Sequence, residues 1–168
     1  MITLILDGYN VIHAVPEMAR HLDRSLQSAR EALVHFCQAY RRRRGDIGRF
    51  YVVFDGRDAE GFGAREQQQG DVTVCFTQKP EEADARILRV IEAQGSRSRC
   101  VVVSNDNEVF NNARAFGARV LSVQEFYQQA QPTKARQADQ RDGDRKVMPS
   151  SRAAEQITEE LRKHLGKR

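Results

Sequence analysis

The sequence is short of the residues that usually bind transition metals. Its three cysteines lie far apart in apolar segments and form no CxxC pair, which favours reduced core thiols over a disulfide framework or a zinc site. The four histidines show no HxH or HExxH spacing, which argues against a metal centre built from histidines. Any metal ion bound by this chain would need oxygen ligands.

Long hydrophobic runs are also absent. The N-terminal apolar run spans residues 2–6, follows no basic segment and ends at Asp7, which predicts neither a signal peptide nor a membrane span. The 168 residues, 40% hydrophobic and 30% charged with a mean hydropathy of -0.64, predict one soluble domain with a sizeable core. We expect a cytoplasmic protein without a membrane partner, and the composition leaves the oligomeric state open.

Several motifs of phosphate chemistry are missing. Neither GxGxxG nor GxxxxGK[ST] follows the first apolar run, which excludes a dinucleotide or P-loop site there. Haloacid dehalogenase-type phosphatases also begin with a strand that ends in Asp-Gly, but they require a DxD motif. Its nucleophilic aspartate would fall at Ile5 or at Val53, and neither side chain can form an aspartyl-phosphate.

Apolar strands and amphipathic helices alternate along residues 1–127. Strands are predicted at 2–6, 50–54, 72–76, 100–103 and 119–122, and helices at 25–43, from Pro80 to near Gly95, from Val109 to Phe116 and at 123–129. Residues 57–70 are predicted to form a loop, because they are rich in glycine and glutamine without an apolar period. Helices between mostly parallel strands predict an α/β sandwich.

The excess positive charge lies in a C-terminal basic extension. From Gln128 onward, ten lysines and arginines accompany six acids, whereas the preceding residues hold seventeen of each. We predict a disordered linker over 128–150, which lacks large apolar residues, and a basic helix or tail over 151–168. The thin apolar stripe of that helix suits docking on a partner or a solvated helix, and both alternatives remain open.

Carboxylates follow the ends of several predicted strands. Asp7, Asp55 and Asp106 come at or just after such ends, and Asp84 lies in the first turn of the helix that starts at Pro80. Because the carboxyl ends of parallel strands share one edge, where ligands bind, we expect these side chains to gather there. Each alone is explained by a turn or a helix cap, but no lysine or arginine stands in the same motifs. The set predicts a site for Mg²⁺ or Mn²⁺.

A site of this kind suits phosphodiester hydrolysis, because a bound ion screens the carboxylates, acidifies a water and stabilises the leaving oxygen. Asn10 and Asn105 are candidates for positioning the water or a carboxylate, and Ser104 for hydrogen-bonding a carboxylate. The candidates for RNA binding are Arg41, Arg42, Arg43, Arg44, Phe62 and Arg65. The arginine run has a second explanation, a helix C-terminus favoured by the helix dipole.

Four segments together resemble a known family. LILDGYNVI, VVFDG, EEADARI and VVVSNDNEV, in this order and spacing, resemble the YacP-like group of NYN domains in the PIN-like nuclease superfamily. The resemblance covers residues 1–127 and implies a PIN-like, Rossmann-like fold and a metal-dependent endoribonuclease. It implies Asp7, Asp84 and Asp106 as metal-binding acids, Asn10 as the motif asparagine, RNA as the substrate, and a link to mRNA decay on the ribosome.

Two positions depart from the family pattern. Many NYN sequences carry further acids where this chain has Ala85 and Phe110. Asp55, Glu82 and Glu108 are candidates to compensate, and the sequence leaves open whether the site holds one ion or two. The alternative is a non-catalytic RNA- or ribosome-binding module that keeps the fold with a degraded metal site. The RNA sequence or structure recognised stays open.

Overall fold

The central element of the structure is a mostly parallel sheet. The computed structural model describes residues 1–56, 66–78 and 81–132. Their strands are β1 (Ile2–Asp7), β2 (Ile47–Phe54), β3 (Glu66–Gln69), β4 (Val72–Phe76), β5 (Cys100–Val103) and β6 (Arg119–Leu121). The spatial order is β3-β4-β2-β1-β5-β6, and only β3, which pairs with β4, runs antiparallel. The predicted α/β fold is confirmed.

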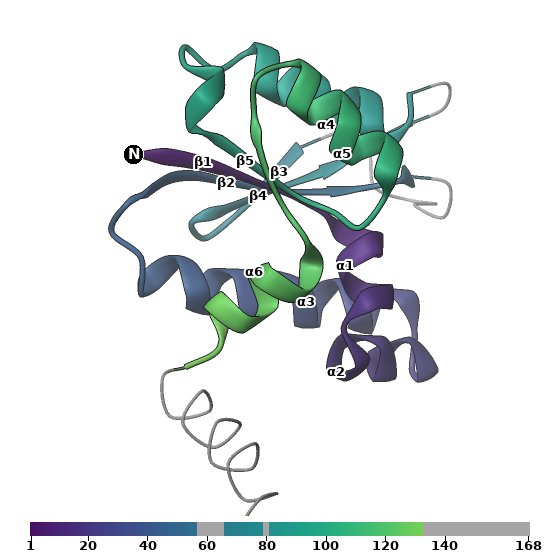
Figure 1. The fold of residues 1–168 in the computed structure, drawn as a ribbon. Coiled ribbons are helices and arrows are strands. Elements are labelled where there is room, and N and C mark those ends of the chain that lie inside the picture. Colours follow the sequence, from purple (N-terminus) through teal and green to yellow (C-terminus); the bar gives the residue numbers. More distant parts are fainter. Residues whose placement is uncertain (57–65, 79–80, 133–168) are drawn as a thin grey trace, which may run out of the picture. The chain divides into compact units, whose positions relative to one another are not determined.

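Helices cover both faces of this sheet (Figure 1). One face carries α1 (Gly8–Ala14), α2 (Pro16–Ala19), the 3₁₀ helix η1 (Arg20–Asp23), α3 (Leu26–Arg42) and α6 (Val123–Ala130). The other face carries α4 (Ala83–Glu92) and α5 (Asn107–Ala115), and the 3₁₀ helix η3 (Arg97–Arg99) precedes β5. In the described residues, no helix is both long and apolar enough to span a bilayer.

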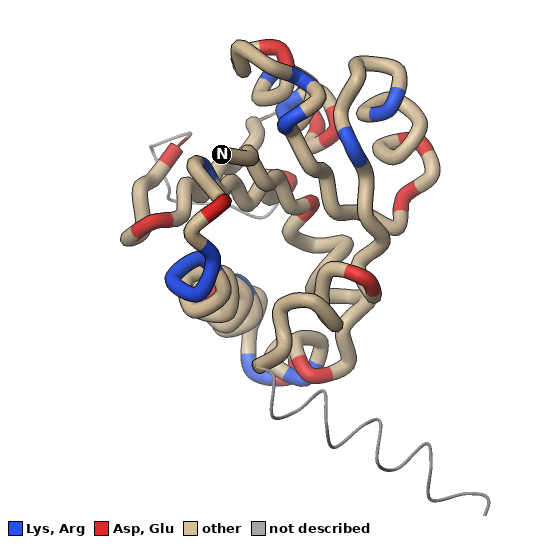
Figure 2. Tube along the Cα trace, turned by 60° about the vertical axis from the view of Figure 1, so that its left-hand side comes forward, with Lys and Arg blue, Asp and Glu red and all other residues tan. Residues whose placement is uncertain are grey.

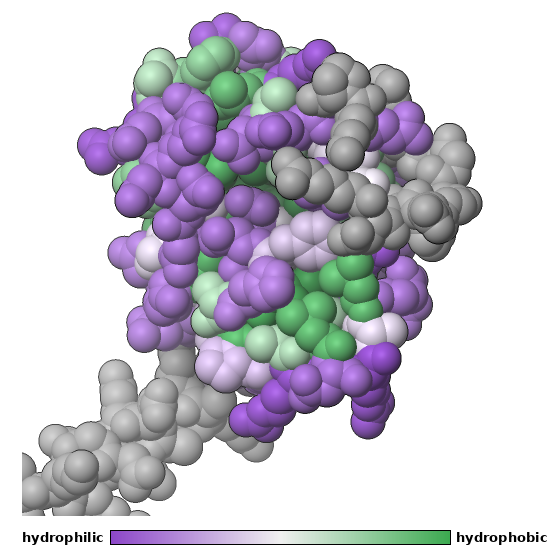
Figure 3. Space-filling model, turned by 90° about the vertical axis from the view of Figure 1, so that its right-hand side faces the viewer, coloured by the Kyte–Doolittle hydropathy of each residue, from purple (hydrophilic) through white to green (hydrophobic). Residues whose placement is uncertain are grey.

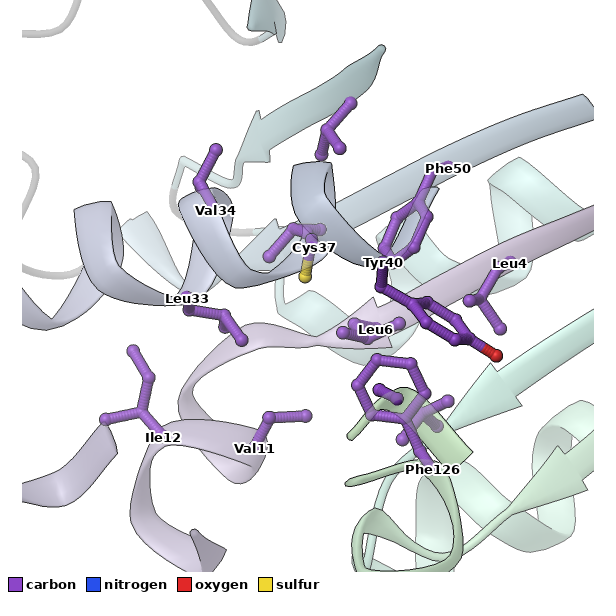
Figure 4. Close-up of a cluster of buried hydrophobic side chains, with 14 of the residues drawn as sticks. Leu4, Leu6, Val11, Ile12, Leu33, Val34, Cys37, Tyr40, Phe50 and Phe126 are labelled. Carbon is purple, nitrogen blue, oxygen red and sulfur yellow. The ribbon is translucent and has the colours of Figure 1, made fainter. Parts of the chain in front are cut away.

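The core has two halves because side chains alternate across each strand. Leu4 and Leu6 of β1 point into the layer under α3 and α6, whereas Ile5 points into the layer under α4 and α5. Figure 4 shows the first layer, in which Phe50, Tyr40 and other buried side chains point toward one another. All three cysteines are free and buried in the structure, so the thiols lie in the core as predicted.

The structure differs from the predicted elements at several places. Helix α1 follows β1 without a loop, and its seven residues are too few to show a helical period. Strand β3 lies within the predicted loop 57–70, because an edge strand pairs through its backbone and needs no apolar alternation. Helix α4 begins at Ala83 rather than at Pro80. Helix α6 continues to Ala130, so order extends beyond residue 127, and residues 133–168 lie outside the described part.

Candidate functional site

The strand order creates a crevice between β1 and β5. The chain adds β2 and β4 on one side of β1, and α4 then leads it back to β5 on the other side. Such a reversal opens a crevice outside the carboxyl ends of the strands, where ligands bind in α/β folds. Asp7 ends β1, and the loop of Ser104 and Asp106 follows β5. This carboxyl edge faces the viewer in Figure 3.

Close packing between neighbouring strand ends explains why glycine follows aspartate in both Asp-Gly pairs at this edge. A Cβ on Gly8 would lie 2.4 Å from the Phe54 ring, and one on Gly56 would lie 1.5 Å from the Thr77 carbonyl oxygen. Neither glycine has a positive φ. Glycine is therefore required here because β1, β2 and β4 approach one another closely, and the turn conformation alone does not demand it.

Ser104 connects two of the predicted metal-binding acids. Its buried hydroxyl donates to Asp7 Oδ2 at 3.2 Å and accepts the backbone N–H of Asp106 at 3.0 Å. Asp106 caps α5, because its Oδ1 accepts the backbone N–H groups of Glu108 at 2.8 Å and Val109 at 3.3 Å. Its Oδ2 makes no hydrogen bond with the described residues, so the cap leaves this oxygen for a ligand.

The two candidate asparagines tie the site to its neighbouring helices. Asn10 Oδ1 accepts the backbone N–H of Asn105 at 2.6 Å. The Asn105 side chain accepts from Val123 N at 2.9 Å and donates to Gln124 Oε1 at 3.1 Å. Asn105 therefore fastens the loop to α6. The Asn10 side-chain amide N–H₂ has no partner among the described residues and stays available to a ligand.

The Asp7 carboxyl is harder to ionise than an ordinary aspartate. Burial, with smaller contributions from Asp84 and Asp106, raises its pKa from 3.8 to about 6, against the opposing effects of the Ser104 hydroxyl and the Asn10 backbone amide. These couplings mean that the three acids, distant in sequence, share one neighbourhood.

Asp84 extends the acidic cluster. Burial raises the pKa of its carboxyl, and repulsion from further acids raises it more; these are Asp106, Glu108, Glu82 and Asp55. All six carboxylates proposed from the sequence therefore lie within electrostatic reach of Asp84 or Asp7.

The donor chemistry of the cluster fits a hard divalent cation. Within residues 1–56, 66–78 and 81–132, no lysine or arginine forms an ion pair with Asp7, Asp84 or Asp106, and oxygen ligands suit Mg²⁺ and Mn²⁺. No described group of three acids is arranged closely enough to hold a metal as it stands. The carboxylates would move together on binding an ion.

Comparison with known proteins places this chain in a family. The model of the YacP-like NYN domain matches residues 4–168. The chain belongs to the YacP-like NYN domain family. The match extends beyond residue 127, where the resemblance in the sequence was predicted to end, so the C-terminal extension is part of the family pattern.

One curated protein and two crystal structures, all from Bacillus subtilis, illustrate the similarity. The uncharacterized protein YacP of strain 168 is 34% identical over 90 residues, which are 54% of this chain and 51% of the relative; the match thus spans about half of that protein. The crystal structure of Rae1 (YacP) has a TM-score of 0.66 and 28% identity, over 99% of this chain and 94% of that one. A crystal structure of a mutant form of Rae1 has a TM-score of 0.66 and 25% identity, over 88% and 86%. Membership in this branch of the PIN-like nucleases supports a nuclease-type function.

The arginine run of this NYN domain lies at the opposite edge of the sheet. Arg41 and Arg42 end α3, and Arg43 and Arg44 follow it just before Ile47, the first residue of β2; Figure 2 shows the run as a continuous blue segment. Eight residues of β2 separate that edge from the carboxylates, a span of about 25 Å. Arg44 pairs with Asp46 at 2.6 Å. The run is thus too far away to bind the phosphate that the carboxylates would face.

The predicted RNA contacts Phe62 and Arg65 lie outside the described residues.

Sequence reasoning missed Arg30, which this NYN domain buries beside the site. Arg30 is 6% exposed, and it stands on the apolar face of α3, four residues after Leu26 and three before Leu33. Arg30 could have been recognised from the sequence, because it is a permanently charged residue on the otherwise apolar face of a predicted helix.

Proposed function

We propose that this NYN domain is a Mg²⁺- or Mn²⁺-dependent endoribonuclease. The observation that supports the proposal is the cluster of Asp7, Asp84 and Asp106 at the topological switch of the sheet, where burial and, to a smaller extent, mutual repulsion raise the pKa of Asp7 and Asp84. Clusters of this kind, kept without a cationic partner, are a mark of functional sites.

Asp7, Asp84 and Asp106 would hold the ion, and Asp55, Glu82 and Glu108 would supplement them. When bound, the ion supplies a water of lowered pKa and charge stabilisation at the phosphate and the leaving oxygen. Ser104 keeps Asp7 Oδ2 oriented.

The helix cap at Asp106 and the Asn10 contact would set the positions of the groups around the phosphate. The α5 cap fixes the Asp106 carboxylate through its Oδ1. Asn10 fixes the loop after β5 through its side-chain oxygen, and its N–H₂ group would donate to the phosphate or the attacking water.

Circular RNA provides the direct test, because only an endonuclease can open it. The purified chain is incubated with single-stranded and with structured circular RNA, with Mn²⁺, with Mg²⁺ or with EDTA. We expect linear product with either ion and none with EDTA. Linear product that persists after chelation would contradict a metal-dependent mechanism.

Replacement of Ser104 tests how the acids are held. Ser104→Ala removes the contacts to Asp7 Oδ2 and to the Asp106 amide, so we expect cleavage to fall about 10- to 100-fold, as for other residues that orient metal ligands. The control is Ser96→Ala, which removes an exposed serine–serine contact before β5. Cleavage rates on circular RNA should separate the two variants, and equal rates would count against the role of Ser104.

The alternative is a non-catalytic RNA- or ribosome-binding module. It is favoured by the open spacing of the described acids and by Ala85 and Phe110 at positions where the family often has acids. It predicts RNA binding that Asp106→Asn leaves unchanged and no linear product with any divalent ion.

We further propose, from the family resemblance, that the substrate is mRNA on the ribosome in the cytoplasm. Co-sedimentation with ribosomes tests this step. A chain that cleaves free RNA but stays at the top of the gradient would restrict the proposal to free RNA.

A further inference from the structure

Arg30 is a buried cation that has no acidic partner among the residues the structure describes. Its Nε donates to the Tyr9 hydroxyl at 2.7 Å, and its Nη2 donates to the same oxygen. No aspartate or glutamate in the described part of the chain pairs with it. Buried guanidinium groups are normally neutralised by a carboxylate or a phosphate, because a lone charge is costly to remove from water.

Three aromatic rings hold the Arg30 guanidinium in one place. Its central carbon lies 5.4 Å from the ring centroid of Tyr9, 5.9 Å from that of Phe54 and 5.5 Å from that of Phe76. These contacts attract a cation but recover only a part of the cost of burying it. The rings therefore orient the group and leave its charge to be matched by something else.

Arg30 lines an open hollow. The hollow is open to solvent, and its walls include Phe54, Phe76, Gln27 and Gln67. Glu31 also lines it, and its Oε1 accepts from Gln27 Nε2 at 2.8 Å, a contact that holds the carboxylate in place without neutralising it. Arg30 still has N–H groups beyond the two that Tyr9 accepts, so a ligand in the hollow meets a fixed donor.

The walls of the hollow formed by Phe54 and Phe76, the last residues of β2 and β4, lie at the same edge of the sheet as the acids. Tyr9 follows Asp7 by two residues, and Phe54 directly precedes Asp55. In Figure 3, hydrophobic surface gathers in the lower part of this edge, where Figure 1 places α1 to α3. An RNA strand bound at the carboxylates would bring further phosphates toward Arg30 if it continued across this side of the edge.

We infer that Arg30 binds a backbone phosphate of the RNA, away from the bond that is cut. The inference rests on the proposed function for the identity of the ligand as RNA. A phosphate fits better than a base because the guanidinium already covers the aromatic faces on which a base would stack. The positive charge of Arg30 also offsets the repulsion between the acidic cluster and the RNA backbone.

Binding in EDTA tests this inference apart from cleavage. Anisotropy with two labelled single-stranded RNAs, an oligouridylate and a mixed sequence, gives the affinity of the full chain at several salt concentrations. We expect Arg30→Gln to weaken binding of both RNAs equally, by about threefold to tenfold, and to lower the salt slope by about 0.7, the value for one phosphate contact with a single strand. Arg97→Gln is the control, since Arg97 also lies over a ring, at 5.8 Å from Phe116, but just before β5 begins.

Each other outcome overturns the inference. Unchanged affinity and slope in a folded Arg30→Gln variant make the residue purely structural, and a loss on one RNA only, with an unchanged slope, indicates base recognition. If that variant fails to fold, Arg30→Lys replaces it. For Arg30→Lys we expect RNA binding at least threefold weaker than that of the native chain, with an unchanged salt slope. Unchanged affinity would overturn the inference. A native chain that binds no RNA overturns the proposed substrate as well, whereas binding without cleavage contradicts only the nuclease.

Discussion

Asp7→Asn is expected to abolish RNA cleavage and to stabilise the metal-free fold at pH 8. The loss of cleavage should be at least about a hundredfold, because changes around metal ligands already cost 10- to 100-fold and this one removes a proposed ligand. The gain in stability follows from the site itself, since Asn removes a charge that burial and the neighbouring acids disfavour.

The sign of the stability change depends on pH. Because the pKa of Asp7 rises from 3.8 to about 6 on folding, the native state holds its proton more tightly than the unfolded state does. The resulting penalty is absent below pH 3.8, grows as pH rises to about 6 and is complete above that value. A shift of this size corresponds to about 3 kcal/mol, so we expect Asp7→Asn to gain about 1–3 kcal/mol at pH 8, after the weakened Ser104 contact is subtracted.

Urea unfolding in EDTA at pH 8 and at pH 4 measures this gain. The matched control is Asp71→Asn, which changes an exposed aspartate in the turn between β3 and β4 and should alter neither cleavage nor stability appreciably. An Asp7→Asn variant that is less stable than the native chain at pH 8 would contradict the account of the acidic cluster, as would one that retains cleavage.

Gly56→Ala should be the most damaging small substitution at the carboxyl edge. Its Cβ would lie 1.5 Å from the carbonyl oxygen of Thr77, and backbone cannot rotate away as a side chain can. Thr77 N also donates to Phe54 O at 3.0 Å, and Gly56 N donates to Thr77 Oγ1 at 3.1 Å. Separating these strand ends breaks both contacts, so we expect a loss of about 3 kcal/mol or more.

The control is Gly45→Ala, because a Cβ at Gly45 meets nothing within 4 Å and its φ is not positive. Urea unfolding should show this variant within about 0.5 kcal/mol of the native chain. Similar stabilities for the two variants would mean that β2 and β4 do not approach as closely as the structure has them.

The layered fold and the gathering of the acids could be predicted because both depend on regular patterns. Buried runs such as Cys100–Val103 identify strands of a parallel sheet, and parallel strands bring their carboxyl ends to one edge. Asp7 and Asp106 were therefore predictable neighbours, although 99 positions separate them.

Other features could not be predicted because they depend on contacts between distant segments. The need for glycine at Gly8 comes from the Phe54 ring, and the role of Asn105 comes from its contacts with α6. The arginine run was assigned to RNA from its charge alone. Its distance from the acids becomes clear only in the structure, where the end of α3 leads into β2 at the edge of the sheet opposite the carboxylates.

Anomalous scattering from a crystal soaked in Mn²⁺ tests the central claim most directly. We predict at least one Mn²⁺ ion with carboxylate oxygens of Asp7, Asp84 and Asp106 at about 2.0–2.3 Å, the range for hard cations with oxygen ligands. Crystals with saturating Mn²⁺ that show no ion among these three residues, or an ion bound only elsewhere, would contradict the claim that the cluster is a metal site.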